Sequence, residues 1–431
     1  MRILVVGAYG LIGTYVTVRL LADGHEIIGA GRDIRAAQRR FPDLRWIPAD
    51  LARCSVEDWA AALSGVEAVV NCAGALQDSP RDDLRAVHLE GVERLAQACV
   101  IAGVQRLVHI SAAGVSEGRA SPFNDTKLAA EQALAQSRLD WVILRPGLVL
   151  APAAYGGTAL LRGLAAFPFV VRSVHGESLV QAVSAEDVAA AVARAVAPDA
   201  PARLSVDLVH AQPWRLDDLI AELRRWLGLP AAPNLPVPTI IAQAVAQLCD
   251  GLSWLGWRSP LRSESLRQLR MGVTGAGEDA ERKLGLRLRS VREMLGGWPA
   301  GVQERWFAKA YFVKPLALTV LALFWLASGL IGLTVSRAQA VAVLTDAQMS
   351  PALANGAVVI GSLVDLALGL AVCFRRSASL ALKGMLVVSA GYMAAGTLVR
   401  PDLWLDPLGP FMKTIPAALL ALAVLALMDE R

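Results

Sequence analysis

The segment ILVVGAYGLIG, residues 3–13, determines how the N-terminal part of the chain folds. Its first four residues are apolar and predict a buried strand, and a glycine-spaced turn follows them and leads into a helical pattern. In such a turn Gly7 permits the tight bend, Gly10 lets the backbone approach a pyrophosphate, and Gly13 lets the helix pack on the strand. The helix N-terminus offers amide donors to the phosphates. The segment therefore predicts a dinucleotide-binding turn, with a purely structural turn as the alternative.

Short apolar runs alternate with helical stretches throughout residues 1–150. The runs are HEIIGAG, LRWIPAD, VEAVVNCAG, VQRLVHIS and LDWVILRPG, and stretches such as TYVTVRLLADG and VERLAQACVIAG lie between them. Strands that alternate with helices form a parallel sheet that has helices on both faces. We therefore expect an α/β fold, with a Rossmann-like doubly wound domain over residues 1–150.

Lys127 is the only lysine in the first 282 residues, and the whole chain has six lysines among 42 basic residues. Where a positive charge is sufficient, this sequence uses arginine. A lysine retained against that preference indicates a task that suits a compact ammonium group, such as binding the vicinal hydroxyls of a ribose. Lys127 is therefore a candidate ligand of a nucleotide cofactor.

The spacing G-x-x-G-x-x-G, the pair Asp50-Leu51, the segment NCAG (residues 71–74), HIS ending at Ser111 and RPG (residues 145–147) form a wider pattern. Over roughly the first 300 residues this pattern resembles the extended and atypical short-chain dehydrogenase/reductases, and within them the NmrA-like proteins and the relatives of a complex I accessory subunit. The resemblance implies catalytic roles for Lys127 and Ser111. Together with the turn it predicts cofactor contacts by Gly7, Ala8, Tyr9, Gly10, Leu11, Ile12, Gly13, Arg32, Asp50, Leu51, Cys72, Ala73, Gly74, Ser111, Lys127 and Pro146.

The residues after the second expected strand bear on the choice of cofactor. An acid at the strand end would bind the ribose 2′-hydroxyl of NAD, whereas an arginine would bind the 2′-phosphate of NADP. Arg32 comes first and Asp33 follows it, so NADP(H) is favoured and NAD(H) remains possible. The alternative role for Arg32 is an ordinary solvated loop charge.

The catalytic pattern of the family is incomplete in this chain. Its proton-donating tyrosine corresponds to Phe123, four residues before Lys127, and its additional serine or threonine corresponds to Ala113. Tyr9 and Tyr155 are possible substitute acids, although packing or surface roles are favoured for both. Two interpretations stay open: hydride transfer to a quinone-like acceptor that takes protons from water, or NADP(H) binding without turnover by a redox sensor or an assembly factor.

Residues 151–310 are expected to form a smaller α/β cap lobe and a linker, at the strand ends where a doubly wound fold binds ligands. Helical patterns there are interrupted by the proline-rich LPAAPNLPVP. Core packing is the expected role of the tryptophans of this region, and contact with a bilayer surface or an apolar pocket is the alternative. These are Trp214, Trp226, Trp254, Trp257, Trp298 and Trp306.

Residues 311–431 contain four apolar runs near 316–334, 352–374, 378–399 and 408–428. Each is close to the roughly 20 residues that a helix needs to cross a bilayer. Basic residues precede the first run and separate the second from the third. The positive-inside rule therefore predicts a four-span protein of the plasma (inner) membrane with both termini in the cytoplasm.

Phrases such as KPLALTVLALFWLASGLIGL and SLVDLALGL resemble the DoxX-like membrane domains, which implies an all-α four-helix transmembrane bundle. Asp365 lies near the middle of the second run, where an ionised carboxylate is costly. Lys383, in the third run, is its best-placed partner. An ion pair, a proton or quinone site, and a neutral acid all remain open for Asp365.

Composition excludes several other classes of function. The five cysteines are scattered, which argues against a disulfide framework or a zinc site, and no metal is expected. A net charge of +4 without a basic stripe argues against nucleic acid binding. Residues 2–6 already read as a strand, so we expect no cleavable signal sequence. The expected partners are a dinucleotide, the lipid bilayer and a lipophilic small molecule; the sequence does not identify a protein partner.

Overall fold

The computed structural model describes residues 1–80, 82–118, 120–407 and 409–428. The chain divides into two compact units. The N-terminal unit comprises Met1–Asp250 and Ser259–Ala308, and the C-terminal unit comprises Gly251–Arg258 and Lys309–Arg431.

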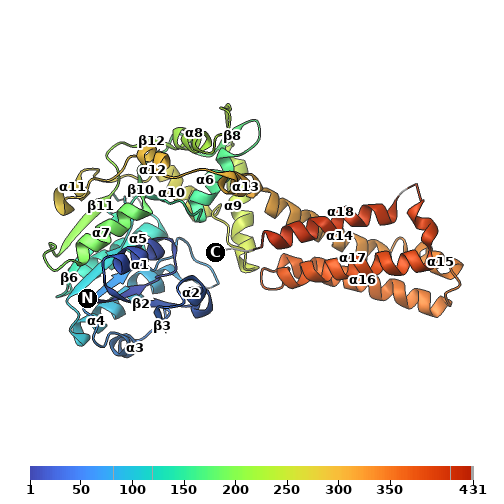
Figure 1. Ribbon diagram of the computed structural model, residues 1–431, viewed down its shortest axis with the longest axis horizontal. Helices are drawn as coiled ribbons and strands as arrows, with labels where there is room; N and C mark the ends of the chain where they lie inside the picture. The colour runs from blue at the N-terminus through green and yellow to red at the C-terminus, as the bar shows by residue number, and fades with distance from the viewer. Residues whose placement is uncertain (81, 119, 408, 429–431) are drawn as a thin grey trace. The chain divides into compact units, whose positions relative to one another are not determined.

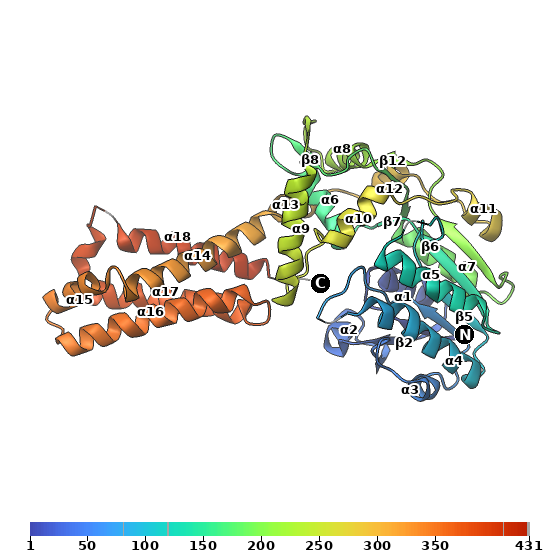
Figure 2. The same cartoon turned by 180° about the vertical axis from the view of Figure 1, so that it is seen from behind.

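Within the described residues, the N-terminal unit is built on a seven-stranded parallel sheet in the order β11-β6-β5-β4-β1-β2-β3. Helices α1 and α7 pack on one face, and α3, α4 and α5 pack on the other (Figures 1 and 2). This arrangement confirms the predicted Rossmann-like α/β fold. The strands are β1 (Arg2–Val6), β2 (Glu26–Gly31), β3 (Arg45–Pro48), β4 (Ala68–Asn71), β5 (Arg106–Ile110), β6 (Asp140–Pro146) and β11 (Leu204–Leu208); the helices are α1 (Leu11–Ala22), α2 (Ile34–Arg40), α3 (Val56–Ala62), η1 (Ala86–Glu90), α4 (Gly91–Ala102), α5 (Pro122–Ala135), α7 (Ala185–Val196) and α11 (Asp279–Leu284).

The strands read as continuous apolar runs because helices cover both faces of the sheet. In β1, Ile3 and Val5 pack in the core beside α1 and α7, whereas Leu4 and Val6 pack in the core on the other face. All four side chains are buried. The loops at the carboxyl ends of the strands therefore begin from a well-packed edge.

A smaller lobe with its own core follows the sixth strand of the sheet. Leu219 and Leu223 of α8 pack there with Met294 of α12, and Trp298 is also buried. Trp254 and Trp306, by contrast, are 76% and 72% exposed. The elements of this lobe are β7 (Leu148–Leu150), α6 (Gly156–Ala165), β8 (Val171–Ser173), β9 (Leu179–Val180), β10 (Ala182–Ser184), β12 (Trp214–Arg215), α8 (Leu216–Trp226), β13 (Asn234–Pro236), α9 (Thr239–Trp254), α10 (Ser263–Met271), α12 (Val291–Gly297) and α13 (Val302–Ala310).

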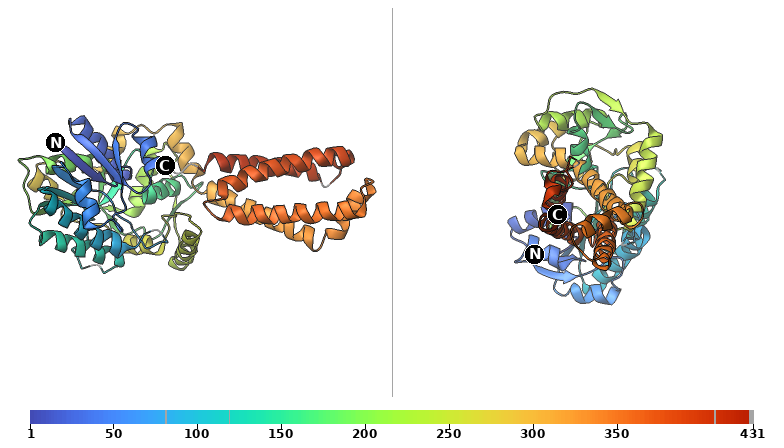
Figure 3. Two further views of the ribbon diagram at one scale, coloured as in Figure 1. Left: turned by 90° about the horizontal axis from the view of Figure 1, so that it is seen from below. Right: turned by 90° about the vertical axis from the view of Figure 1, so that its right-hand side faces the viewer.

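Among the described residues, the C-terminal unit has three helices long and apolar enough to cross a membrane: α14 (Val313–Leu333), α16 (Pro351–Cys373) and α17 (Ala378–Val399). A further apolar helix, α18 (Pro410–Ala426), has 17 residues and runs alongside them (Figures 1 and 3). Leu408, where the predicted fourth run begins, lies outside the described residues. The bundle agrees with the expected all-α domain; the connecting helices are α15 (Arg337–Asp346) and η2 (Pro401–Trp404).

Asp365 links three helices of this bundle. It is 6% exposed and accepts hydrogen bonds from the Ser328 hydroxyl of α14 at 2.9 Å and from the Tyr392 hydroxyl of α17 at 3.0 Å. Lys383 precedes Tyr392 by about 13 Å along α17, because each helical residue rises about 1.5 Å. The Asp365–Lys383 ion pair, one of the three possibilities that the sequence leaves open, therefore does not form. Lys383 instead lines a groove between α16 and α17.

Helices α14 and α16 approach closely at glycine residues. A Cβ added to Gly329 would lie 2.5 Å from the Ser362 carbonyl oxygen, and one added to Gly369 would lie 2.9 Å from the Leu326 backbone nitrogen. In lipid, association of helices depends on van der Waals packing, so small residues at the contact bring the backbones together.

We predict that Gly369→Ala lowers the free energy of unfolding of the detergent-solubilised protein by about 1–3 kcal/mol, because its methyl group overpacks the contact with Leu326. Gly356→Ala, on the same helix, is the matched control, since a Cβ there meets no atom within 4 Å. Thermal unfolding of the two variants checks this prediction. Equal melting temperatures would contradict it.

Candidate functional site

The glycine turn holds the backbone of β1 and α1 in close contact. Gly7 has φ of 76°, and the backbone N–H of Gly10 donates to the Gly7 carbonyl oxygen at 2.9 Å. A Cβ added to Gly13 would lie 2.1 Å from that same oxygen. Because Gly10 is the N-cap residue of α1 and has no side chain, the first amide groups of the helix remain available to an anion.

Lys127 extends from α5 to the carboxyl edge of the sheet. It is 4% exposed, and its ammonium group donates to the carbonyl oxygen of Ile110, the last residue of β5, at 2.9 Å. A Cβ added to Gly74 would lie 3.4 Å from Nζ, so the loop after β4 passes directly beside the ammonium. Burial lowers the pKa of Lys127 to about 8, although the nearby Glu131 carboxylate opposes this shift.

Polar groups of β4 and β5 surround this lysine. Asn71 accepts from the backbone N–H of Ala73 at 3.1 Å, and its side-chain amide contacts His109 Nδ1 at 3.1 Å. The Ser111 hydroxyl is buried and has no hydrogen-bond partner among the described residues. Burial raises the pKa of Cys72 to about 12, so its thiol stays protonated. The structure thus brings Lys127, Ser111 and residues 72–74 together, as the sequence leads one to expect.

Phe123, four residues before Lys127, lies against a histidine. Its ring meets the His88 ring edge-on, with 5.5 Å between the centroids and 81° between the planes. His88 Nε2 accepts from the backbone N–H of Ala75 at 3.1 Å, which leaves the ring proton on Nδ1, 2.9 Å from the Thr126 hydroxyl. Burial, followed by the charge of Lys127, lowers the pKa of His88 to about 2. Neither ring can therefore supply an acidic proton.

Ala113, at the position expected for the additional serine or threonine, is also apolar. Ala113 is 9% exposed, and its backbone N–H donates to the carbonyl oxygen of Pro146 at 2.9 Å. That hydrogen bond joins the loop after β5 to the end of β6. Ala113 therefore supports the site through its backbone and offers no side-chain hydroxyl.

The two charged residues after β2, Arg32 and Asp33, have different partners. Arg32 forms an ion pair with Asp82 at 2.7 Å between Nη1 and Oδ1. The Asp33 carboxylate accepts from the Ala36 N–H and caps α2. The Tyr9 hydroxyl accepts from the Asp33 N–H at 3.1 Å, and a Cβ added to Gly31 would lie 2.3 Å from the Tyr9 ring. Tyr9 is thus held at the end of β2.

Most of the remaining predicted site residues follow the carboxyl ends of β1 and β3. Asp50 accepts from the Ala52 N–H at 3.1 Å, and Leu51 is buried. Leu11 and Ile12 form the first turn of α1 after the buried Ala8. Tyr155 is the N-cap residue of α6 in the smaller lobe.

Sequence reasoning missed His88, His109 and Glu131. Glu131 is 4% exposed and pairs with Arg145 of β6, and this carboxylate stabilises the charge of Lys127. His88 lies on the π-helical turn η1, a distortion often found at functional sites. The available signals were that the chain has only five histidines and that Glu131 follows Lys127 by one helical turn.

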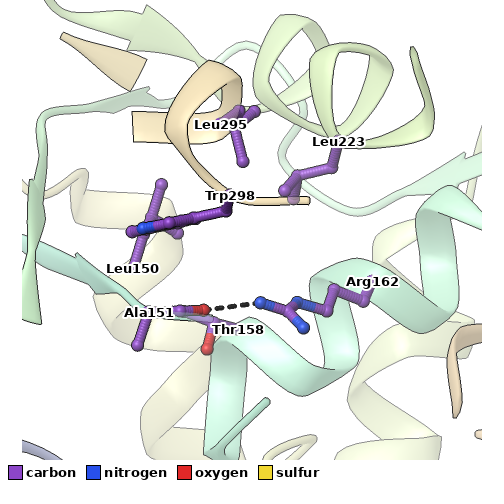
Figure 4. A pocket seen from close by; sticks show the side chains of 7 residues that line it. All are labelled: Leu150, Ala151, Thr158, Arg162, Leu223, Leu295 and Trp298. Atoms are coloured by element: carbon purple, nitrogen blue, oxygen red, sulfur yellow. Dashed lines mark hydrogen bonds between the residues drawn. The ribbon is translucent and has the colours of Figure 1, made fainter. Parts of the chain in front are cut away.

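A buried arginine in the cap lobe is a weaker candidate (Figure 4). Arg162 donates to the Ala151 carbonyl oxygen at 2.5 Å, and its guanidinium lies 4.8 Å from the centroid of a Trp226 ring. The cavity beside it holds about 10 Å³. That is room for about one water molecule, so Arg162 serves the packing of the lobe. No group of three or more His, Cys, Asp or Glu side chains able to hold a metal occurs among the described residues.

The geometry at the carboxyl edge of the sheet fits a dinucleotide. Free helix amides lie at one end of the β1 turn, and a buried ammonium with an unpartnered hydroxyl lies beside β5. The fold and the site together define an NAD(P)H-binding Rossmann protein.

Comparison with known proteins agrees with this class. Residues 7–199 match the NAD(P)H-binding family, and residues 322–422 match the DoxX-like family. An epimerase family protein of Mycobacterium bovis is 30% identical over 216 residues, which are 45% of this chain and 68% of that protein. The chain belongs to the NAD(P)H-binding proteins, with a relative in the epimerase family, and carries a C-terminal DoxX-like domain.

Two further relatives cover more of the chain. Sterol demethylase protein B of Methylococcus capsulatus is 28% identical over 337 residues, which are 71% of this chain and 99% of that protein. The photosystem II assembly factor Ycf39 of Synechocystis sp. is 28% identical over 233 residues, 53% of this chain and 68% of that protein.

Solved structures share the fold. Triphenylmethane reductase of Citrobacter sp., complexed with NADP(H), has a TM-score of 0.53 and 19% identity, covering 69% of this chain and 99% of its own. The enzyme WbmG of Bordetella bronchiseptica, in complex with NAD, has a TM-score of 0.53 and 18% identity, covering 69% of this chain and 92% of its own.

We predict that NADPH binding weakens as the pH rises through about 8, the pKa of Lys127. Above that pH the side chain loses its charge and one of its three N–H donors, whereas below it the ammonium persists. Fluorescence titration of NADPH at about pH 7 and about pH 9.5, where the unperturbed lysine would still be protonated, measures the effect.

The variant Lys127→Ala should bind NADPH about 10- to 100-fold more weakly at about pH 7, which is the worth of a hydrogen bond to a charged group, and should lose the pH dependence near 8. Lys127→Arg should also bind weakly, because the buried site is shaped for an ammonium. Lys283→Ala, on α11, is the matched charge control. Wild-type affinity in Lys127→Arg would refute the role given to the ammonium.

Proposed function

We propose that the protein is a membrane-anchored, NADP(H)-dependent oxidoreductase that acts on a lipophilic, quinone-like acceptor. The observation that carries this proposal is the buried ammonium of Lys127 beside the glycine turn, in a chain that also has three membrane-length apolar helices. The likeness to sterol demethylase protein B over 99% of that relative also favours a lipophilic substrate. Anchoring would keep the site near substrates that dissolve in lipid.

Each site residue has a defined task in this proposal. The turn from Gly7 to Gly13 and the N-terminus of α1 bind the pyrophosphate, and Lys127 binds the nicotinamide ribose with Ser111 beside it. A bound reduced nicotinamide supplies a hydride. Phe123 and Ala113 supply no proton, so the acceptor takes its proton from water, as a quinone can when it becomes a quinol.

NADP(H) is favoured by the way the chain uses the two charges after β2. Asp33 is engaged in capping α2, so its carboxylate is not positioned as a ligand for a ribose 2′-hydroxyl. Arg32 lies beside it at the strand end, where a guanidinium binds a 2′-phosphate. Exchange of the Asp82 carboxylate for that phosphate would keep the arginine paired.

We further infer that the C-terminal unit crosses the plasma (inner) membrane four times, with both termini in the cytoplasm. α18 is the fourth span in this proposal; its 17 residues are near the lower limit for crossing the hydrocarbon layer. Arg375 and Arg376 lie in the loop between α16 and α17, and basic residues precede α14. By the positive-inside rule, this loop and the segment before α14 lie on the cytoplasmic side.

A second candidate function is NADP(H) binding without turnover, in a redox sensor or an assembly factor for a membrane partner. The edge-on contact between Phe123 and His88 favours it, because apolar packing occupies the position of the usual proton donor. The likeness to the photosystem II assembly factor Ycf39 points the same way.

One experiment separates the two functions. With the full chain in lipid nanodiscs, NADPH and a water-soluble quinone should give a steady loss of the reduced nicotinamide absorbance that requires both substrates. Lys127→Ala should reduce this rate at subsaturating NADPH by about the factor by which it weakens binding. Tight NADPH binding with no oxidation would eliminate the oxidoreductase in favour of the sensor.

The cofactor preference has its own test. Arg32→Ala should weaken NADPH binding about tenfold and leave NADH binding within about twofold, because only NADPH carries the 2′-phosphate. Arg39→Ala removes an equal charge from the last turn of α2 and is the control. Equal losses for both cofactors would contradict the preference for NADP(H).

A further inference from the structure

Helix α9 carries a stripe of large aliphatic side chains on its outer side. Ile241, Val245 and Leu248 are 52%, 40% and 64% exposed. Their spacings of four and three residues place them on one face of the helix, and Leu252 continues the stripe. Another face is buried in the N-terminal unit through Ala242 and Ala246. Helix α9 therefore packs through alanines and presents its larger apolar residues outward.

This pattern is the reverse of a helix that faces water. Residues 239–249 contain no charged residue, and the exposed polar residues Gln243 and Gln247 lie on the far side of the helix from the stripe. Contiguous apolar surface of this kind marks a protein or membrane contact. The lack of charge along three helical turns favours lipid over a polar protein surface.

The end of α9 is tied to the membrane bundle. From Gly251 onward the chain belongs to the C-terminal unit. There the Trp257 indole donates to the Cys373 carbonyl oxygen at 2.6 Å, and the Arg375 N–H donates to the Leu255 carbonyl oxygen at 3.0 Å. Cys373 and Arg375 lie where α16 ends and the turn to α17 begins. Residues 255–257 are thus held at an end of the apolar helices, the level at which a bilayer surface begins.

The chain passes from the N-terminal to the C-terminal unit a second time after Ala308, and exposed aromatic side chains lie just before this point as well. Trp306 and Phe307 of α13 are 72% and 41% exposed, and α14 begins a few residues later at Val313. Exposed tryptophan directly before a membrane helix is typical of the interface.

We propose that the stripe of α9, formed by Ile241, Val245, Leu248 and Leu252, is embedded in the cytoplasmic surface of the lipid bilayer. A helix that lies in the membrane interface buries its apolar face about 5–10 Å deep. The lipid-bound stripe is continuous with residues 251–258 of the membrane bundle. This proposal rests on the part of the proposed function that puts the C-terminal unit in a bilayer. It does not depend on hydride transfer.

Helix α9 is also connected to the candidate cofactor site. Asp250, the last residue of α9 in the N-terminal unit, accepts from the Gln77 side chain at 2.8 Å and from Arg262 at 3.0 Å. Gln77 belongs to the loop that continues from Gly74 after β4. Binding of the stripe to lipid therefore anchors the helix that holds this cofactor-site loop.

Photocrosslinking of the full chain in nanodiscs of phosphatidylcholine and phosphatidylglycerol tests the proposal. The crosslinking residue p-benzoylphenylalanine replaces Leu248 in the stripe or Gln247, its exposed neighbour on the polar side. A second pair at Val245 and Gln243 guards against a variant that fails to fold. The stripe positions should give several-fold more protein–lipid adducts by mass spectrometry than the glutamine positions.

Two outcomes would overturn the proposal. Equal lipid adducts at the stripe and glutamine positions would mean that α9 does not face the bilayer. Covalent dimers from the stripe positions, in place of lipid adducts, would show that a second copy of the chain covers the stripe. NADPH titration of the same samples is read separately, so loss of cofactor binding is distinguishable from loss of lipid contact.

Discussion

The close approach of the Gly7 carbonyl group to the α-carbon of Gly13 is the constraint on which the nucleotide-binding edge depends. Any side chain at residue 13 would overlap that carbonyl group, since even a Cβ would come within 2.1 Å of its oxygen. The contact lets α1 begin directly at the end of β1, so its N-terminal amides lie at the carboxyl edge of the sheet. Strands β4 and β5, which follow one another on the same side of β1, then bring Asn71, His109 and Ser111 to that edge.

Lys127 is a buried charge, and burying a charge is costly unless polar groups surround it. Here the Ile110 carbonyl oxygen accepts from the ammonium, and the carboxylate of Glu131 favours its charged form. The same neighbourhood holds Phe123 against a neutral His88. The site therefore has groups that suit a nucleotide ribose, while aromatic packing occupies the position where the sequence pattern predicts a proton donor. This combination suits an acceptor that obtains protons from water, and it equally suits a protein that binds the cofactor without turnover.

The two units meet different physical demands. In the N-terminal unit apolar side chains fill a core between sheet and helices, whereas in the C-terminal unit they also face outward, as is typical of helices that cross a bilayer. Asp365 shows how the bundle accommodates a polar group, since hydroxyls from two neighbouring helices donate to its carboxyl group. Helix α9 has the outward aliphatic side chains of the second unit although most of it belongs to the first.

The sequence by itself determined the parts that depend on local pattern. Strand and helix periods predicted the parallel sheet, the glycine spacing located the turn, the isolated Lys127 indicated a candidate ligand of the cofactor, and the apolar runs predicted the helical C-terminal bundle. Only the tertiary structure decided which side chains meet. His88 reaches Phe123 from a different helix, Asp33 caps α2 beside Arg32, and Asp365 bonds to Ser328 and Tyr392 where the sequence suggested Lys383. Periodicity reports which face of an element is apolar, whereas a hydrogen-bond partner depends on which elements pack together and at what height along their axes.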